Sequence, residues 1–389
     1  MTENKTTFAI SKPDFVMLSL LIVVSISLAV LVYSFGGVDF GVYYAAGRVF
    51  LRGGNPYNYS QLAGEIVSST GKTNNPYYYA PWFTWMMSLL AIFPYKAARV
   101  TWALFNFGLW FWSLFNLSRL IAWPLPGWRR WGMYLFVTFV FAWATWGSEQ
   151  VGVLIFFILT LVMLSYKKGK WLSMGIWMAL LLFKPNITTI PLLALSLWLL
   201  LRRGWIPVVS MSAMLLVMVS ISLLVSPGWY LELLKPDKVT GLSFTLNETG
   251  AVEVQRYTTT LMDWLSAYGL NGKAATAIYT VFALAGIMLL GWTVFKSRSV
   301  IQLMAVAVWV NFALVPYALF YDYPSLTLTL FYINAGFSEK PGLAWAKWIM
   351  NCLILASLFV GGNISYRYWI VVILMFAALA GRAFSMKRQ

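Results

Sequence analysis

Apolar residues run along this chain in long blocks that short polar segments separate. The first block, residues 15–35, holds 21 residues without a charge, which is enough for an α-helix to cross a hydrocarbon core of about 30 Å. A cleaved signal peptide would have a shorter apolar stretch and a small-residue cleavage site, whereas YSFGGVDF occurs here. The pattern therefore predicts a retained signal anchor.

Further apolar blocks predict an all-α polytopic protein with about twelve membrane-spanning helices. One additional block, 79–93, is short, begins at Ala80-Pro81 and stops at Phe93-Pro94, so we expect it to be re-entrant or to lie in the membrane interface. The predicted spans are 15–35, 98–119, 131–147, 150–165, 171–184, 186–201, 205–226, 274–295, 299–318, 323–337, 343–361 and 366–382.

Composition agrees with a membrane protein. Of the 389 residues, 60% are hydrophobic and only 10% are charged, whereas soluble domains have about 25% charged residues. The formal net charge is +16, but the basic residues form short clusters between apolar blocks. We therefore interpret them as topology signals next to membrane lipids, and predict no nucleic-acid partner.

The basic clusters also predict the orientation. With both termini cytoplasmic and 79–93 not spanning, the cytoplasmic segments hold 17 of the 28 basic residues and three of the 12 acidic ones, in agreement with the positive-inside rule. If 79–93 also spanned, the basic clusters YKKGK and LRRGW would lie on the extracytoplasmic side, which disagrees with that rule. The chain is then one domain, 1–389, with two extracytoplasmic loops, 36–97 and 227–273, that are long enough to be functional.

Several kinds of chemistry are excluded or disfavoured. The chain has no histidine and a single cysteine, Cys352, which excludes His-based triads, HExxH zinc sites and a disulfide framework. Neither GxxxxGK[ST] nor GxGxxG occurs, so nothing indicates a soluble nucleotide site. Acid and base roles must fall to Asp, Glu, Lys, Tyr or Arg, and we expect an activated substrate to be linked to a lipid and to reach the site from the bilayer.

Five ionisable residues fall at the extracytoplasmic ends of predicted spans. Polar groups at membrane depth are costly unless they pair or line a cavity, so this placement predicts one outward-facing site. The residues are Asp39, Glu149, Lys184, Asp263 and Asp322.

Each candidate also has a structural interpretation. Asp39 is suited to cap a helix through VYYAAGRVFL, and Glu149, followed by Gln150, would favour the helix N-terminus that it precedes. Lys184 would simply extend its ammonium towards the membrane surface. Asp322, between two tyrosines and a proline, would form a cap or turn.

Two further features concern ligand contacts. Tyr43 follows Asp39 by four residues and Gly47 follows Tyr43 by four, so they share a helix face that leaves room for a ligand or another backbone, although packing is the alternative. In the second loop, Arg256 offers a bidentate fork for phosphate, although it is also explained as a surface charge.

The motifs together resemble a known family. DFGVYYAAGRVFLRGGNPY, NNPYYYAPW, WGSEQ, FKPN and RRGW occur in that order from about residue 36 to 205, with weaker agreement at YALFYDYPSL. The pattern is similar to that of the membrane GT-C glycosyltransferases of family 87, the polyprenyl-phosphate-mannose-dependent α-mannosyltransferase type.

The resemblance implies a GT-C fold in a cell (plasma or inner) membrane, a catalytic Asp in the first extracytoplasmic loop and a polyprenyl-phosphate sugar as donor. Asp39 matches that Asp, and Lys184 matches the family's Lys-Pro position. Glu149-Gln150 stands where members often have Gly-Gln, and the histidines that some members carry near the late outward-facing segment have no equivalent here.

These residues lead to a hypothesis about mechanism. Asp39 would be the general base, Lys184 and Arg256 would hold the donor phosphate, and no metal or other cofactor would be needed. The acceptor, lipid-linked or a glycan, would be bound or oriented by Tyr43, Tyr44, Tyr78, Tyr79, Glu149, Gln150 and Asp322. A different sugar or acceptor, or a lipid or glycan transporter or flippase, is the alternative.

Overall fold

The computed structural model describes residues 12–34, 39–71, 77–121, 127–234, 260–270, 272–315, 317–338, 344–357 and 364–385. In these ranges the chain forms helices joined by turns and no β-strand, which confirms the all-α class. Each predicted span overlaps a helix. Two of the described helices, α11 (Trp205–Val225) and α16 (Gly272–Lys296), are long and apolar enough to cross a membrane by length and composition. The number of crossings and their orientation stay predictions.

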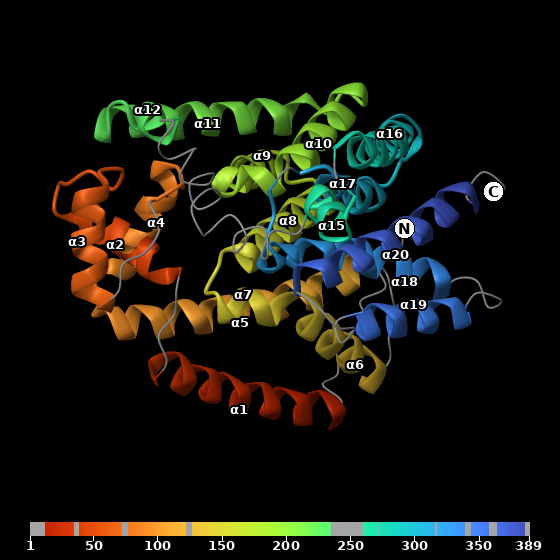
Figure 1. The fold of residues 1–389 in the computed structure, drawn as a ribbon, viewed down its shortest axis with the longest axis horizontal. Helices are drawn as coiled ribbons and strands as arrows, with labels where there is room; N and C mark the ends of the chain where they lie inside the picture. Colours follow the sequence, from red (N-terminus) through yellow and green to blue (C-terminus); the bar gives the residue numbers. More distant parts are fainter. Residues whose placement is uncertain are drawn as a thin grey trace.

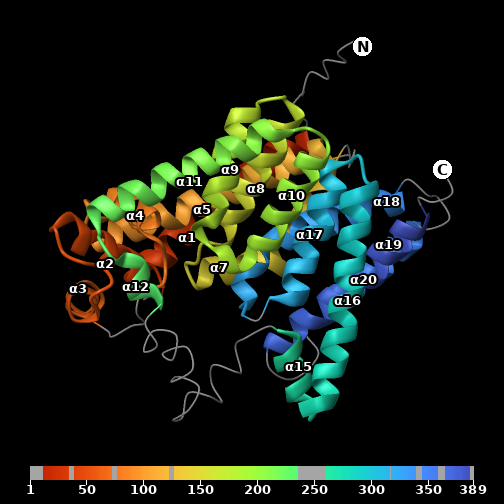
Figure 2. The same ribbon diagram turned by 90° about the horizontal axis from the view of Figure 1, so that it is seen from above.

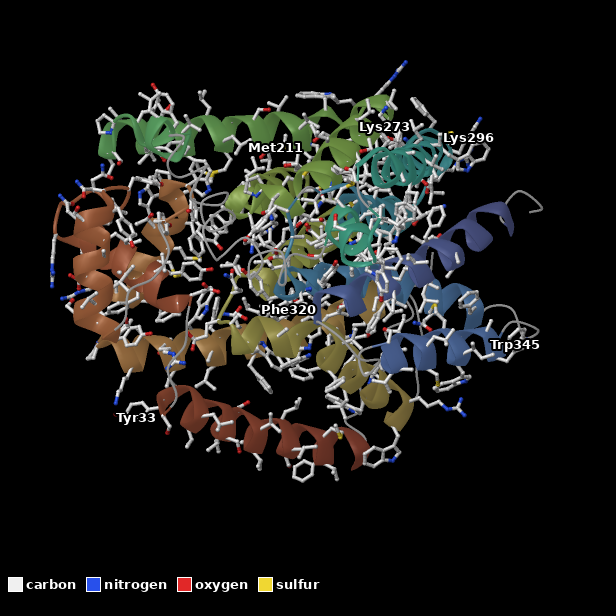
Figure 3. All side chains as sticks on the ribbon, viewed as in Figure 1. Tyr33, Met211, Lys273, Lys296, Phe320 and Trp345 are labelled. Atoms are coloured by element: carbon white, nitrogen blue, oxygen red, sulfur yellow. The ribbon has the colours of Figure 1, made fainter. Side chains whose placement is uncertain are left out.

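The N-terminal helix runs along one side of the molecule (Figure 1). This helix, α1 (Lys12–Ser34), lies against α5 (Tyr95–Leu120) and α6 (Gly127–Val137). Much of its side-chain surface faces outwards, and Figure 3 shows Tyr33 on α1 and Trp345 near the C-terminal end of the chain at the periphery. Both are exposed, at 54% and 62%. Apolar side chains on the outside suit a molecule surrounded by lipid.

The first predicted loop folds into three short helices. They are α2 (Phe40–Leu51), α3 (Tyr59–Thr70) and α4 (Pro81–Ala91), and α2 packs against both of the others. A methyl group at Gly47 would lie 3.0 Å from the backbone carbonyl oxygen of Met87. The space that the sequence predicted at Gly47 is therefore occupied by another backbone, that of α4.

The central helices connect the first loop to the rest of the molecule. They are α7 (Trp143–Gly147), α8 (Gly152–Lys167), α9 (Trp171–Leu180) and α10 (Thr189–Leu201). α8 packs between α5 and α9, and α9 packs closely on α11, where a methyl group at Gly175 would lie 2.4 Å from the carbonyl oxygen of Pro207. A π-helical turn, Thr138–Ala142, joins α6 to α7; such turns are frequent at functional sites.

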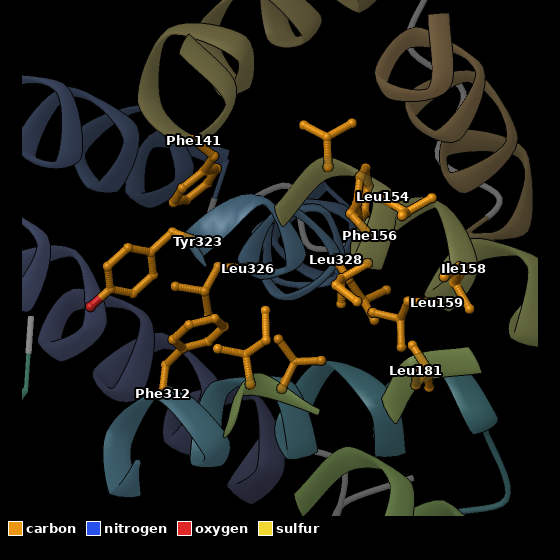
Figure 4. Close-up of a cluster of buried hydrophobic side chains, with 14 of the residues drawn as sticks. Phe141, Leu154, Phe156, Ile158, Leu159, Leu181, Phe312, Tyr323, Leu326 and Leu328 are labelled. Carbon is orange, nitrogen blue, oxygen red and sulfur yellow. The ribbon is translucent and has the colours of Figure 1, made fainter. Parts of the chain in front are cut away.

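The C-terminal half surrounds a short 3₁₀ helix, η4 (Phe320–Ser325), that enters the core. Figure 4 shows Tyr323 of η4 among buried side chains from other helices, and its ring centroid lies 4.8 Å from that of Phe312. η4 also contacts α7 and α8. The other helices of this half are α17 (Val300–Leu314), α18 (Leu326–Ser338), α19 (Ala344–Ser357) and α20 (Ile364–Ser385).

The second predicted loop is described at its two ends, by α12 (Trp229–Leu234) and α15 (Leu261–Ala267). In Figure 2, α15 lies beside one end of the long helix α16, which it contacts. Residues 235–259 lie outside the described residues, and with them the predicted phosphate ligand Arg256.

Candidate active site

Asp39 directly precedes α2, but its side chain does not cap that helix. The backbone carbonyl of Asp39 accepts from the N–H groups of Val42 and Tyr43, at 3.1 and 3.4 Å, whereas the carboxylate makes no capping hydrogen bond. Instead, its Oδ2 accepts from Nε2 of Gln150 at 2.7 Å. The first loop thus presents a carboxylate to the turn between α7 and α8.

Gln150 connects the members of this site. Its Oε1 accepts from the hydroxyls of Tyr43 at 2.7 Å and Tyr79 at 3.2 Å, and from Nζ of Lys184 at 3.4 Å. If the amide were flipped, its NH₂ would face the Lys184 ammonium and its oxygen would face the Asp39 carboxylate. Donors would then meet donors, so the network fixes the amide orientation.

Lys184 forms a buried ion pair with Asp322, from Nζ to Oδ1. Oδ2 of Asp322 accepts from the N–H of Leu319 at 3.1 Å, so Asp322 also closes the first turn of η4, as its structural interpretation predicted. Asp322 is fully buried and Lys184 is 8% exposed. The FKPN and FYDYP motifs therefore meet through these two side chains.

A second contact joins FKPN to the YALFYDYPSL segment. Nδ2 of Asn186 donates to the carbonyl oxygen of Tyr317 at 3.1 Å, and Asn311 of α17 donates to the carbonyl oxygen of Asn186 at 3.0 Å. At the break in the helix after Lys184, the carbonyl oxygen of Asn186 is thus paired with a side chain of α17. The bond from Asn186 to Tyr317 joins this break to the segment that leads into η4.

The WGSEQ turn places two side chains by means of an unusual backbone conformation. Glu149 has a φ of 57°, in the left-handed region that few non-glycine residues adopt. Its carboxylate pairs with Nε of Arg99, and its backbone carbonyl accepts from Nε1 of Trp102 at 2.9 Å. With α5 holding Glu149, the next side chain, Gln150, points to Asp39.

The residues of the site differ in exposure. Tyr43, Gln150, Lys184 and Asp322 are all buried, and of the residues in the Gln150 network only Asp39 and Tyr79 are half-exposed. These two are therefore the members of the network that a ligand can reach without displacing other side chains.

Burial raises the pKa values of two carboxyl groups at this site, those of Asp39 and Glu149. Burial raises the pKa of Asp39 above 3.8, although the hydrogen bond from Gln150 and the charge of Lys184 act in the opposite direction. Burial raises the pKa of Glu149 to about 7, although Arg99 opposes that shift. One oxygen of Glu149, Oε2, is buried and has no hydrogen-bond partner among the described residues, which agrees with a costly charge at this position.

Other predicted residues lie apart from this network. The hydroxyl of Tyr44 donates to the carbonyl oxygen of Phe93 at 2.9 Å, and the side chain of Tyr78 is exposed. The N–H of Asp263 donates to Oγ1 of Thr260 at 3.2 Å, at the start of α15. The described contacts do not connect these three residues to Gln150.

Three neighbours were missed by the sequence interpretation. Arg99 is the buried partner of Glu149, and a basic residue at the outward end of a predicted span was a signal that could have identified it. Nζ of Lys184 lies 5.1 Å from the ring centroid of Tyr321, and the carbonyl oxygen of Tyr317 accepts from Asn186, two residues after Lys184. Both tyrosines belong to the YALFYDYPSL segment.

The described residues contain no group of three or more His, Cys, Asp or Glu side chains that would hold a metal ion. The charged groups near Asp39 are instead Lys184, Asp322 and the Glu149–Arg99 pair. The site thus combines a half-exposed carboxylate with a buried ammonium group, and both are hydrogen-bonded to one amide.

Comparisons with known proteins concern the family of the chain. Neither the curated proteins nor the solved structures include one that matches the chain. The family model for glycosyltransferase family 87 matches residues 77–320, which is more than half of the chain and includes Tyr79, Arg99, Gln150 and Lys184. The match and the apolar helices together show that the chain belongs to glycosyltransferase family 87 and is a membrane glycosyltransferase.

Proposed function

We propose that the protein transfers a sugar, with mannose as the expected sugar, from a polyprenyl-phosphate donor to a hydroxyl group of a lipid-linked or glycan acceptor. The reaction would take place on the extracytoplasmic side of a cell membrane, without a metal and with inversion at the anomeric carbon. The observation that supports it is that Gln150 is hydrogen-bonded to Asp39 on one side and to Lys184 on the other.

Asp39 is the proposed general base. Its Oδ2 is occupied by Gln150, and no described residue donates to its Oδ1, so Oδ1 is the oxygen that takes the proton of the acceptor hydroxyl. The acceptor oxygen then bonds to the anomeric carbon, and the bond from that carbon to the phosphate oxygen breaks with its electron pair. The polyprenyl phosphate leaves as an anion, and Asp39 later releases its proton to solvent.

Lys184 is the proposed cation for the leaving phosphate. An ammonium group has three N–H donors, and two of them are directed at Asp322 and Gln150. The third is available for a phosphate oxygen. Holding the ammonium in place before the reaction makes it effective at stabilising developing charge. In this scheme Asp322 positions Lys184, and Arg256 would add a second phosphate contact.

The remaining residues position the base and the acceptor. Tyr43 and Tyr79 fix Oε1 of Gln150, so that Nε2 stays directed at Asp39. The Glu149–Arg99 pair fixes the turn that carries Gln150. Tyr79 is half-exposed beside Asp39 and is proposed to contact the sugars, together with Tyr78, which is exposed in the same segment. Tyr44 is buried and bonds to Phe93, so it is left out of this proposal.

The test is a donor panel with the purified protein in detergent. We would incubate it with a native lipid extract and either polyprenyl-phosphate mannose, glucose or arabinose, or a nucleotide sugar alone, and identify products by mass spectrometry. Addition of a hexose from the mannose donor is expected, with none from a nucleotide sugar alone. Product from the nucleotide sugar and none from the polyprenyl donors would refute the proposed donor class. The same protein would also be placed in liposomes, where movement of a glycolipid across the membrane without any product would favour the transporter alternative.

A further inference from the structure

A cavity of about 320 Å³ lies at the other end of the central helices, away from Asp39. Tyr166, Trp171, Trp198, Arg202 and Arg203 line it, so it lies between the α8–α9 turn and the α10–α11 turn. α8 begins next to Gln150 and has 16 residues, which separates the two sites by about 24 Å at 1.5 Å per residue. The cavity is therefore no part of the candidate active site.

All charged residues in the segment of the chain that forms this cavity are basic. Between Glu149 and Glu232 the chain has no acidic residue. Arg202 and Arg203 are exposed at the cavity, and Lys167, Lys168 and Lys170 are exposed in the adjacent α8–α9 turn. A concentration of like charges without carboxylates attracts anions.

Arg202 is held in place without losing its charge. Its guanidinium carbon lies 4.4 Å from the ring centroid of Trp198. Its Nη1 donates to the carbonyl oxygens of Trp198 and Val294, both at 3.2 Å, and its Nη2 donates to that of Ser297. These carbonyls lie at the C-terminal ends of α10 and α16, where a cation is favoured. All three acceptors are neutral, so the positive charge remains available to a ligand.

The surface beside the cavity is apolar. Trp171 is 38% exposed, and Leu172 on α9, with Trp205 and Val209 on α11, is exposed as well, at 67%, 58% and 54%. Tryptophan gathers at the membrane interface because it combines an apolar ring with a polar N–H. An acyl chain can cover these side chains while an anionic headgroup occupies the cavity.

We propose that this cavity binds the headgroup of an anionic membrane phospholipid, with Arg202 and Arg203 as the phosphate ligands, at the face of the protein opposite to Asp39. Arginine suits this task because its planar fork binds phosphate oxygens in pairs. Basic pockets between helices on the cytoplasmic side are general sites for such headgroups, and the positive-inside rule predicts that side for this end of the helices.

The test compares phosphatidylglycerol with phosphatidylcholine of the same acyl chains, added to the purified full-length protein in neutral detergent. Thermal unfolding would be followed at increasing lipid concentration, and retained lipid would be detected by native mass spectrometry. Phosphatidylglycerol should raise the unfolding temperature and remain bound, whereas phosphatidylcholine should do neither. An equal effect of both lipids would refute the proposal, and so would an equal effect of inorganic phosphate, since the proposal requires a lipid.

Variants localise the effect. Arg202→Gln combined with Arg203→Gln should require a higher lipid concentration for the same shift, by roughly five-fold for each arginine removed. The control is Arg129→Gln combined with Lys347→Gln, which removes the same charge from α6 and α19, on the opposite side of the molecule from α10 and α11 (Figure 1). The control should retain the wild-type response. A loss of the same size in both double variants would show a non-specific charge effect and refute the site.

A single variant protects the test against misfolding. Arg202 bonds to the ends of two helices, so its removal can itself destabilise the protein. Arg203→Gln removes a side chain without a described hydrogen bond and should weaken the lipid response alone. An unchanged response in Arg203→Gln would remove Arg203 from the site and contradict the proposal. No sugar donor enters these measurements, so their outcome is independent of the proposed transferase reaction.

Discussion

Lys184 and Asp322 lie 138 residues apart in the sequence and form a buried ion pair at the centre of the candidate active site. Breaking a buried pair by removing one partner leaves an uncompensated charge, which typically costs about 3–5 kcal/mol. Lys184→Met and Asp322→Asn should therefore each lower the stability of the protein in thermal unfolding. The double variant should be more stable than the sum of the single effects predicts, because it leaves neither charge alone.

The same double variant separates stability from catalysis. In the proposed mechanism Lys184 pairs with Asp322 and also binds the leaving phosphate. The double variant should therefore recover much of the stability but not the transfer activity, measured as kcat with the polyprenyl-phosphate donor. Recovery of activity in parallel with stability would instead assign both residues a purely structural role.

Asp39→Asn tests the base assignment. The asparagine carbonyl can still accept the hydrogen bond from Gln150, so folding should be preserved, whereas loss of a general base should lower kcat by about 10²–10⁴-fold. Asp263→Asn is the matched control, since Asp263 carries the same group at the start of α15, and it should retain activity. Wild-type transfer by folded Asp39→Asn would refute the assignment.

The pH profile should reveal how Gln150 acts on Asp39. The base must be ionised, so kcat/KM should fall as the pH decreases through the pKa of Asp39, which burial places above 3.8. The Gln150 hydrogen bond lowers that pKa. Gln150→Met should therefore move the acidic limb of the profile to higher pH. A uniform loss of kcat/KM with an unmoved limb would contradict this positioning role.

Glu149 should make stability depend on pH. Its pKa is about 7 in the folded protein against an ordinary value of 4.5, so the folded state binds more protons than the unfolded state between these pH values. The stabilisation is present below pH 4.5 and is lost as the pH rises through about 7. The total effect is about 3 kcal/mol at most.

Glu149→Gln removes the titrating group and should flatten this dependence. Thermal unfolding in detergent at several pH values would show it, as a smaller fall in unfolding temperature over this pH range than in the wild type. Equal slopes would show that other groups cause the dependence. The slope is the readout, because Arg99 loses its charged partner in the variant and absolute stability changes as well.

Gly152 should be intolerant of a side chain. It opens α8, and a methyl group there would lie 2.4 Å from the carbonyl oxygen of Tyr321 and 3.1 Å from the ring of Pro324. Gly152→Ala should therefore displace η4, and Asp322 with it, at a cost of about 1–3 kcal/mol, with reduced kcat. Gly108→Ala in α5 meets open space and should leave unfolding temperature and activity near wild type. Equal effects would contradict the close packing of η4.

Local sequence was sufficient to locate the apolar helices, although not the short helices α3, α12 and α15 of the two loops. Uncharged blocks such as 15–35 must satisfy their backbone hydrogen bonds internally in lipid, and a helix does this within one segment. The same reasoning identified polar residues that are costly in such surroundings, among them Lys184 and Asp322. These expectations needed only neighbouring residues, because helix formation depends on contacts three or four positions apart.

The pairing of those polar residues could not be read from the sequence. Asp39 was equally well explained as a helix cap, and only the position of α2 against the α7–α8 turn directs its carboxylate to Gln150. Likewise, Arg99 and Glu149 meet because α5 packs on α8, and Tyr44 turns away from the network to bond to Phe93. The sequence by itself determined the apolar helices and the unusual polar groups that they carry. The packing of helices far apart in the chain decided which of these groups meet. The physical reason is that a buried carboxylate or ammonium is stabilised by whichever partner the fold brings within hydrogen-bonding distance.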